Sequence, residues 1–162
     1  MTGFESSFQD LIGNEGGYVD NPSDPGGATR YGITERVARA HGYSGDMHEL
    51  PLETAREIAK AEYWTPAGCE HLDDRLAFQV LDGAYNSGVA QSVKWLQQAA
   101  GAVQDGVFGP ATLSAVNAKG TDMLIERYNA HRLMFLTNLP TWETFGKGWA
   151  RRIANNLLKA AQ

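Results

Sequence analysis

Apolar residues recur at helical spacing along most of this chain of 162 residues. Phe4, Phe8, Leu11 and Ile12 lie three, four or one positions apart, which predicts a helix over residues 3–14 with one apolar face. The same periodicity predicts further helices, over residues 35–41, 52–64, 76–86, 93–101, 123–139 and 142–157. We therefore expect a mainly α-helical protein.

One segment carries turn residues in place of this periodicity. Asn-Pro, Asp-Pro and Gly-Gly pairs punctuate residues 21–27. Tyr18–Val19 and Tyr31–Ile33 flank them and are expected to pair as short strands. The pattern predicts a small β-hairpin lobe at about residues 17–33, facing the helical body across a cleft. The fold class is then mainly α, in an α+β arrangement.

Glu15 stands at the predicted end of the first helix, where Gly16 and Gly17 stop it. The negative end of a helix dipole disfavours a carboxylate and favours the protonated acid. A general acid must hold its proton near neutral pH, so Glu15 is a candidate for that role. The competing interpretation is an exposed helix end, which is the commoner place for a glutamate.

Asp24 follows Glu15 by nine residues, and Thr29 follows five residues later. Glycosidases commonly use two carboxyl groups that face each other across the scissile bond between two sugars. Asp24, assisted by Thr29, is the candidate to position and activate a water molecule, and Asp20 remains a rival for that role. Each residue taken alone fits an ordinary turn.

Together these residues resemble a known catalytic signature. The boxes Glu15-Gly16-Gly17-Tyr18, Pro22-Ser23-Asp24-Pro25-Gly26-Gly27-Ala28-Thr29 and Gly32-Ile33-Thr34 are similar to those of phage-type muramidases, glycoside hydrolase family 108. The resemblance implies a lysozyme-like fold with residues 1–90 as the catalytic region. It also implies cleavage of the bond between N-acetylmuramic acid and N-acetylglucosamine in peptidoglycan, with Glu15 as the acid.

Several other residues are candidates to bind the sugars. Tyr18 and Tyr31, with Trp64 and Tyr85, offer rings that could stack on sugars or belong to the core. Asp82 and Asn86 lie four positions apart on one helix face, which fits either a sugar cleft or a buried amide network. The resemblance favours the cleft, because similar muramidases carry an Asp-x-x-x-Asn-x-Gly stretch here.

A second motif follows the helix at residues 93–101. Asp105, Gly106, Gly109 and Pro110 form a predicted loop, and Pro110 opens the next helix. This loop resembles those of peptidoglycan-binding segments, which implies that residues 91–162 bind the cell wall. No low-complexity linker separates the two regions, so we expect one compact body. A stripe of apolar residues is expected to dock on the helix at 123–139: Trp142, Phe145, Trp149, Ile153 and Leu157.

Charge is unevenly distributed. The chain has a formal net charge of −5, yet residues 127–162 contain six basic side chains and one acidic one, Glu143. The acidic catalytic half argues against nucleic acid as a partner. The basic C-terminal helix could contact an anionic cell envelope, although these side chains also fit the solvated faces of helices.

The remaining features concern cofactors and location. The single cysteine, Cys69, excludes an internal disulfide and fits a small core residue, and the four histidines show no metal-ligand spacing. We expect no metal and no cofactor, and a monomer. No signal peptide is recognised, so we expect the host cytoplasm, with access to the wall through a holin or another export route.

Two other functions stay open. A lytic transglycosylase also uses a glutamate but needs no carboxylate to activate water. A non-catalytic virion component that binds the cell wall could have kept the same fold.

Overall fold

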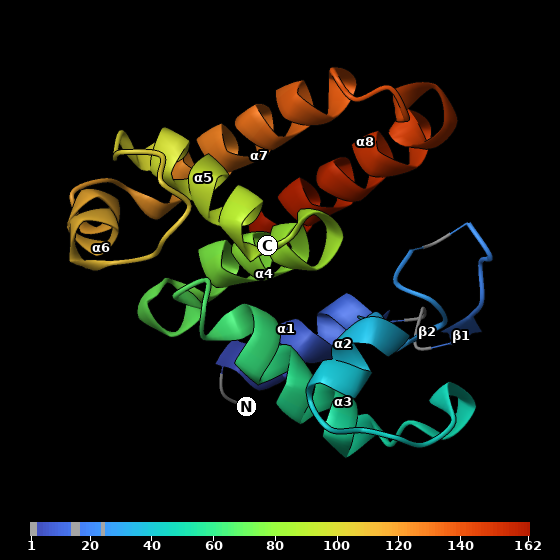
Figure 1. Ribbon diagram of the computed structural model, residues 1–162. Coiled ribbons are helices and arrows are strands. Elements are labelled where there is room, and N and C mark those ends of the chain that lie inside the picture. The colour runs from blue at the N-terminus through green and yellow to red at the C-terminus, as the bar shows by residue number, and fades with distance from the viewer. Residues whose placement is uncertain (1–2, 14–16, 24) are drawn as a thin grey trace.

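The computed structural model describes residues 3–13, 17–23 and 25–162 (Figure 1). This part of the chain is mainly helical with one small antiparallel sheet, as predicted. Its α-helices are α1 (Gly3–Ile12), α2 (Glu35–Ala40), α3 (Leu52–Ala59), α4 (Asp74–Ser87), α5 (Val89–Ala100), α6 (Pro110–Asn117), α7 (Thr121–Thr137) and α8 (Trp142–Ala160). Its shorter elements are the strands β1 (Tyr18–Val19), β2 (Thr29–Arg30) and β3 (Ile33–Thr34), the 3-10 turns η2 (Met47–Glu49) and η4 (Cys69–His71), and the π-helical turn η3 (Lys60–Trp64).

The sheet corrects the predicted hairpin. It has three strands in the order β1-β2-β3, and Tyr18 pairs with Arg30, whereas residues 31–33 were expected to pair with β1. Tyr31 and Gly32 instead form the turn between β2 and β3, with φ angles of 51° and 75°. Two successive positive φ angles are what a tight hairpin turn requires, so the chain reverses once more than predicted. Thr34 then caps α2, because its hydroxyl accepts a hydrogen bond from the Val37 amide.

Helix α4 lies at the centre of the molecule, between α1 on one side and α5, α7 and α8 on the other (Figure 1). All of its residues from Leu76 to Ala84 are therefore buried. On the far side Trp95 of α5 and Tyr128 of α7 meet edge to face and are almost wholly buried. Trp64, a candidate for sugar stacking, is instead 5% exposed and packs edge-on against Phe4 of α1, so it belongs to the core.

Helix α8 packs antiparallel to α7, as Figure 1 shows, but by a different face from the predicted one. Ile153 is buried, whereas Phe145 and Leu157 are 51% and 37% exposed. The buried face runs through Gly146, Ile153, Asn156 and Ala160. A count of large apolar residues missed this face because it consists mainly of small or polar side chains.

The aromatic residues at the start of α8 gather on the helix surface. Trp142 and Trp149 have ring centroids 6.1 Å apart, and those of Phe145 and Trp149 are 5.7 Å apart. Gly146 has a packing reason in this group, because a Cβ at this position would overlap the ring of Trp142. Within the described part of the chain, no helix is both long and apolar enough to cross a membrane.

Candidate active site

A cavity of about 540 Å³ opens between the sheet and the helical body. Leu11 and Ile12, at the end of α1, form one wall, and Thr29 and Thr34 of the sheet form another. The remaining wall comes from the end of α4 and from α8, through Tyr85, Asn86 and Arg152. This volume is in the range of sites that bind small molecules or a few sugar rings.

Two of the three predicted catalytic residues, Glu15 and Asp24, lie outside the described residues. Ile12 and Gly17, on the two sides of the segment that contains Glu15, both line the cavity. Thr29 lines it too, and its catalytic role stays a prediction. Asp20, the rival of Asp24, is exposed and is not part of the lining.

The turn at Tyr31 and Gly32 presses against helix α4. A Cβ on Gly32 would lie 2.8 Å from the Tyr85 ring, so both the positive φ and this close approach require glycine. The left-handed backbone of Tyr31 is uncommon for a bulky residue, and Arg30 lies 4.9 Å from its ring centroid. Tyr31 lines the cavity, and its binding to a sugar stays a prediction.

Tyr85 is the other aromatic residue of this wall. Its ring lies 4.4 Å from that of Tyr63, and burial raises the pKa of its hydroxyl. That hydroxyl is buried and has no hydrogen-bond partner among the described residues. A buried hydroxyl without a partner is unusual, and Tyr85 is among the residues that line the cavity.

Tyr18 lies apart from the cavity lining. Its ring stacks on the imidazole of His48, with centroids 3.5 Å apart. Partial desolvation, and then the nearby Asp20, Asp46 and Glu35 carboxylates, raise the pKa of Tyr18. The ring therefore braces β1 against the η2 turn, and its assignment to substrate binding stays a prediction.

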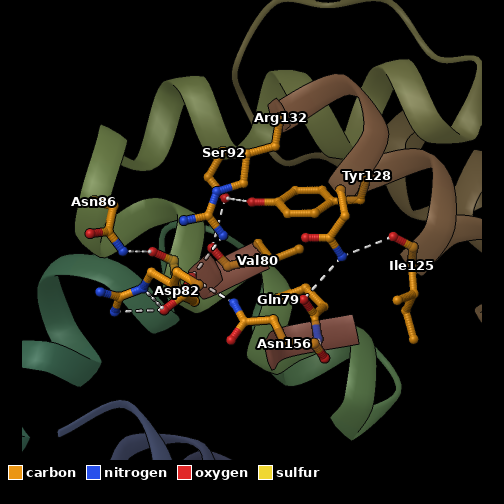
Figure 2. A network of polar contacts seen from close by, with 11 residues as sticks. Gln79, Val80, Asp82, Asn86, Ser92, Ile125, Tyr128, Arg132 and Asn156 are labelled. Atoms are coloured by element: carbon orange, nitrogen blue, oxygen red, sulfur yellow. Dashed lines mark hydrogen bonds and ion pairs between the residues drawn. The ribbon is translucent and has the colours of Figure 1, made fainter. Parts of the chain in front are cut away.

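Asp82 lies in a buried network in which its partners are two arginines and one amide (Figure 2). The sequence left open a sugar cleft or a buried amide network, and neither alternative included the arginines. Its carboxylate accepts hydrogen bonds from Arg132 at 2.7 Å and from Arg152 and Asn156 at 2.8 Å each. Burial opposes ionisation, but the two guanidinium charges and their hydrogen bonds outweigh it and hold the pKa of Asp82 below its ordinary value. The Asp82 carboxylate thus joins α4 to α7 and α8 through these hydrogen bonds.

Around this ion pair the polar side chains form further links, which Figure 2 shows. The Gln79 amide donates to the Asn156 carbonyl and accepts from Asn129, while Ser92 and Tyr128 share a hydrogen bond of 2.7 Å. Asn86 sits at the end of α4, where its side-chain amide donates to the Asp82 carbonyl oxygen and also lines the cavity. Of the predicted pair Asp82 and Asn86, only Asn86 borders this cavity.

Arg152 is a site residue that the local pattern did not single out. It lies in α8, which follows α4 in the sequence, whereas the sheet precedes α4. Its guanidinium reaches the cavity because Asp82 orients it. The only sequence signal was its place in a stretch that resembles peptidoglycan-binding segments. An arginine with one edge bound to Asp82 has its remaining donors directed by that contact.

The predicted wall-binding loop is held by Gln97. This buried side chain donates to Asp105 at 2.8 Å and to Thr112 at 3.0 Å, and it accepts from the Gly106 amide. The Val107 amide and then Gln97 bond to the Asp105 carboxylate and lower its pKa. Gly106 has a φ of 75°, and a Cβ there would lie 3.1 Å from the Ala90 carbonyl oxygen.

Downstream of this loop, Pro110 begins α6 after Gly109, as predicted. The known contacts of Asp105 and Gly106 thus explain the shape of the loop. The binding of this loop to the cell wall stays a prediction.

Basic side chains near the C-terminus are fewer on the surface than the sequence indicated. Arg132 and Arg152 pair with Asp82, and Lys159 pairs with Asp10 at 2.5 Å. Lys147 and Arg151 are exposed, with no ion-pair partner in the described ranges. A possible contact with an anionic envelope therefore depends on fewer charges than the six that were counted.

The acidic, histidine and cysteine side chains are the candidates to hold a metal ion. In residues 3–13, 17–23 and 25–162, no three of these lie together in a way that could hold a metal ion. Cys69 is buried, and this desolvation raises the pKa of its thiol. A buried, protonated thiol is a poor nucleophile and a poor ligand.

Comparisons with known proteins match the two regions separately. Residues 8–88 match the family described as Glycosyl hydrolase 108, and residues 91–154 match a family described as "Predicted Peptidoglycan domain". A solved structure entitled "Structure of Brucella abortus SagA" is 36% identical and superposes with a TM-score of 0.89, covering 98% of this chain and 93% of that one. A search of curated proteins found no match. The chain thus belongs to the glycosyl hydrolase 108 family, as a glycosidase of peptidoglycan with a peptidoglycan-binding domain in its C-terminal half.

Proposed function

We propose that this protein is an endolysin-type N-acetylmuramidase, which cleaves the bond between N-acetylmuramic acid and N-acetylglucosamine with Glu15 as general acid. The observation that carries the proposal is the cavity at the junction of α1 and the sheet. Its lining includes Ile12 and Gly17, which flank the segment of Glu15, and Thr29 on the opposite side. Membership of a peptidoglycan-directed glycosidase family supplies the substrate class.

The proposed reaction begins with protonation of the leaving glycosidic oxygen by Glu15. Asp24, assisted by Thr29, then holds and deprotonates a water molecule that attacks the sugar from the opposite face. Inversion of configuration follows if the two carboxyl groups lie about 6.5–9.5 Å apart, whereas about 5–5.5 Å corresponds to a retaining enzyme. Asp20 is less suited to this role because it is exposed and does not line the cavity.

The test uses purified peptidoglycan and follows both turbidity and the masses of the released fragments. Glu15→Gln should lower the rate by at least about 10²-fold, the usual size of a lost general acid, with unfolding temperature unchanged or higher. Glu57→Gln, on the exposed face of α3, is the matched control and should behave like wild type. Full activity of Glu15→Gln would refute the assignment.

Fragment masses separate the proposal from its two competitors. Hydrolysis gives a reducing N-acetylmuramic acid, whereas a lytic transglycosylase gives an anhydro ring that is lighter by one water. A non-catalytic wall-binding protein would give no fragments at all. The second carboxylate is tested in the same assay, where Asp24→Asn should abolish turnover and Asp20→Asn should have a mild effect.

The biological setting follows from the proposed activity. We propose that the protein acts as a monomer made in the host cytoplasm and reaches the wall through a holin or another route across the inner membrane. Lys147 and Arg151 would supply any electrostatic contact with the anionic envelope. No nucleic acid partner and no cofactor are part of this proposal.

A further inference from the structure

A second cavity, of about 660 Å³, adjoins the first along helix α8. The two share Leu11, Asn86 and Arg152 as lining residues, so a polymer that leaves the first cavity on this side enters the second. The outer wall of the second cavity belongs to α8, where it is formed by Gly148, Trp149 and Asn155. Gly148 and Trp149 lie in the region that matches the peptidoglycan domain, and Asn155 follows directly after that region.

The side chains of this second cavity suit a polysaccharide. Trp149 is partly exposed and offers an apolar ring, while Asn86 and Asn155 are exposed amides that can both donate and accept hydrogen bonds. The lining carboxylates are already engaged, Asp82 by its two arginines and Asp10 by Lys159. Arg151 and Arg152 also line this cavity, so it combines an apolar ring and amides with cationic donors. Such a composition suits a hydroxyl-rich ligand that also carries acidic groups.

Gly148 gives an independent indication of a ligand. A glycine inside a helix is less favourable than an alanine, and α8 contains two. Gly146 is explained by the ring of Trp142, but a Cβ at Gly148 would meet no heavy atom of the described chain within 4 Å. Its φ is also not in the left-handed region. Because Gly148 has no side chain, it leaves open space at the cavity wall, and a ligand can approach the helix backbone there.

The wall is also fixed in place. Arg152, four residues after Gly148, is bound to Asp82 of α4, and Asn156 is bound to the same carboxylate. These contacts therefore fix the position of α8, which lines the second cavity, relative to α4, which lines the first. A site of this kind is preorganised, so binding does not require α8 to be ordered first.

We infer that the second cavity binds the continuation of the glycan strand, so that α8 supplies saccharide subsites to the catalytic cleft. The C-terminal region then extends the active site, in addition to any separate contact with the wall. This inference rests on the proposed function, since it takes the first cavity as the place of cleavage. It adds the requirement that long glycan strands are better substrates than short ones.

The experiment fills the second cavity without disturbing the fold. Gly148→Phe projects a ring into the open space, Gly148→Ala adds one methyl group, and Ala154→Phe places the same ring on an exposed position of α8 outside both cavities. The kcat/KM is measured on soluble peptidoglycan glycan strands of defined length, from four sugars to more than ten. We expect the long-to-short ratio to fall about tenfold or more in Gly148→Phe, as for a blocked contact pocket. Gly148→Ala and Ala154→Phe should keep the wild-type ratio.

The outcomes separate this inference from the proposed function. An inactive wild type on every strand would refute the function itself. An active wild type with the same ratio in folded Gly148→Phe as in Ala154→Phe would overturn only the α8 subsites. If Gly148→Phe does not fold, Asn155→Ala replaces it, with Asn117→Ala on α6 as the matched control. The long-to-short ratio of kcat/KM should then fall in Asn155→Ala but not in Asn117→Ala. Equal ratios in the two variants would count against the α8 subsites.

Discussion

The Nε atom of Arg152 lies 2.8 Å from Oδ1 of Asp82, and this contact joins α4 to α8 through two residues that are 70 positions apart in the sequence. Asp82 is 2% exposed, and Arg132 binds its other oxygen at 2.7 Å. The buried carboxylate of Asp82 therefore connects the region that matches the glycosidase family with the C-terminal region of the chain. Such a contact is costly to break, because a single substitution leaves charges without a partner in the interior.

The first prediction is that Asp82→Ala lowers the free energy of unfolding by about 3–5 kcal/mol, the usual loss when one partner of a buried ion pair is removed. Two guanidinium groups would remain, one of them buried. Urea unfolding followed by circular dichroism measures the effect. Asp122→Ala is the matched control, since Asp122 pairs with Arg75 at 2.8 Å but is 77% exposed, and its loss should be below about 1 kcal/mol. Equal losses in the two variants would show that burial of the Asp82 pair does not matter.

The second prediction concerns pH. The pKa of Asp82 is lower in the folded protein than its ordinary value of about 3.9, so near that value the unfolded chain binds more protons than the folded one. The contribution of the pair is complete above about pH 5 and is lost as the pH falls through the folded-state pKa. The difference in unfolding free energy between wild type and Asp82→Asn should therefore shrink below about pH 4. A difference that stays constant from pH 6 to pH 3 would contradict the assignment.

The third prediction concerns the loop at residues 105–109. Gln97→Met keeps the volume of the side chain but removes its bonds to Asp105, Thr112 and the Gly106 amide. We expect a loss of about 1–3 kcal/mol, because buried groups remain unpaired. Hydrogen exchange at the Gly106 amide should become faster. Gln98→Met, one position along the same helix and partly exposed, should leave both quantities close to wild type.

The sequence predicted the helices and the loop before α6 well because these depend on local patterns. Periodicity located each long helix to within a few residues, and the Gly-x-x-Gly-Pro spacing marked the start of α6 at Pro110. The strand register failed, since nothing local distinguishes Tyr31 as a turn residue. Its left-handed conformation accompanies contacts with Arg30 and the close packing of Gly32 on Tyr85.

The site was harder to predict where it depends on distant partners. The spacing of Asp82 and Asn86 placed both on one helix face, but Arg132 and Asn156, which engage Asp82, lie 50 and 74 residues away. The buried face of α8 was missed for a related reason. Its contacts use Gly146, Asn156 and Ala160, and a hydropathy pattern gives little weight to such residues.

The last prediction is that α8 is required for folding. Its removal, by ending the chain after Thr141, would expose the surface that Ile153 and Ala160 cover and would leave Asp82 without Arg152 and Asn156. We expect a compact but loosely packed state, with helical far-ultraviolet signal, weak near-ultraviolet signal and binding of an apolar dye. Removal of only Ala161 and Gln162, which are exposed, is the control and should preserve a cooperative thermal transition. A truncated protein that melts cooperatively and still cleaves peptidoglycan would show that residues 1–141 fold independently, and that α8 is an accessory to binding alone.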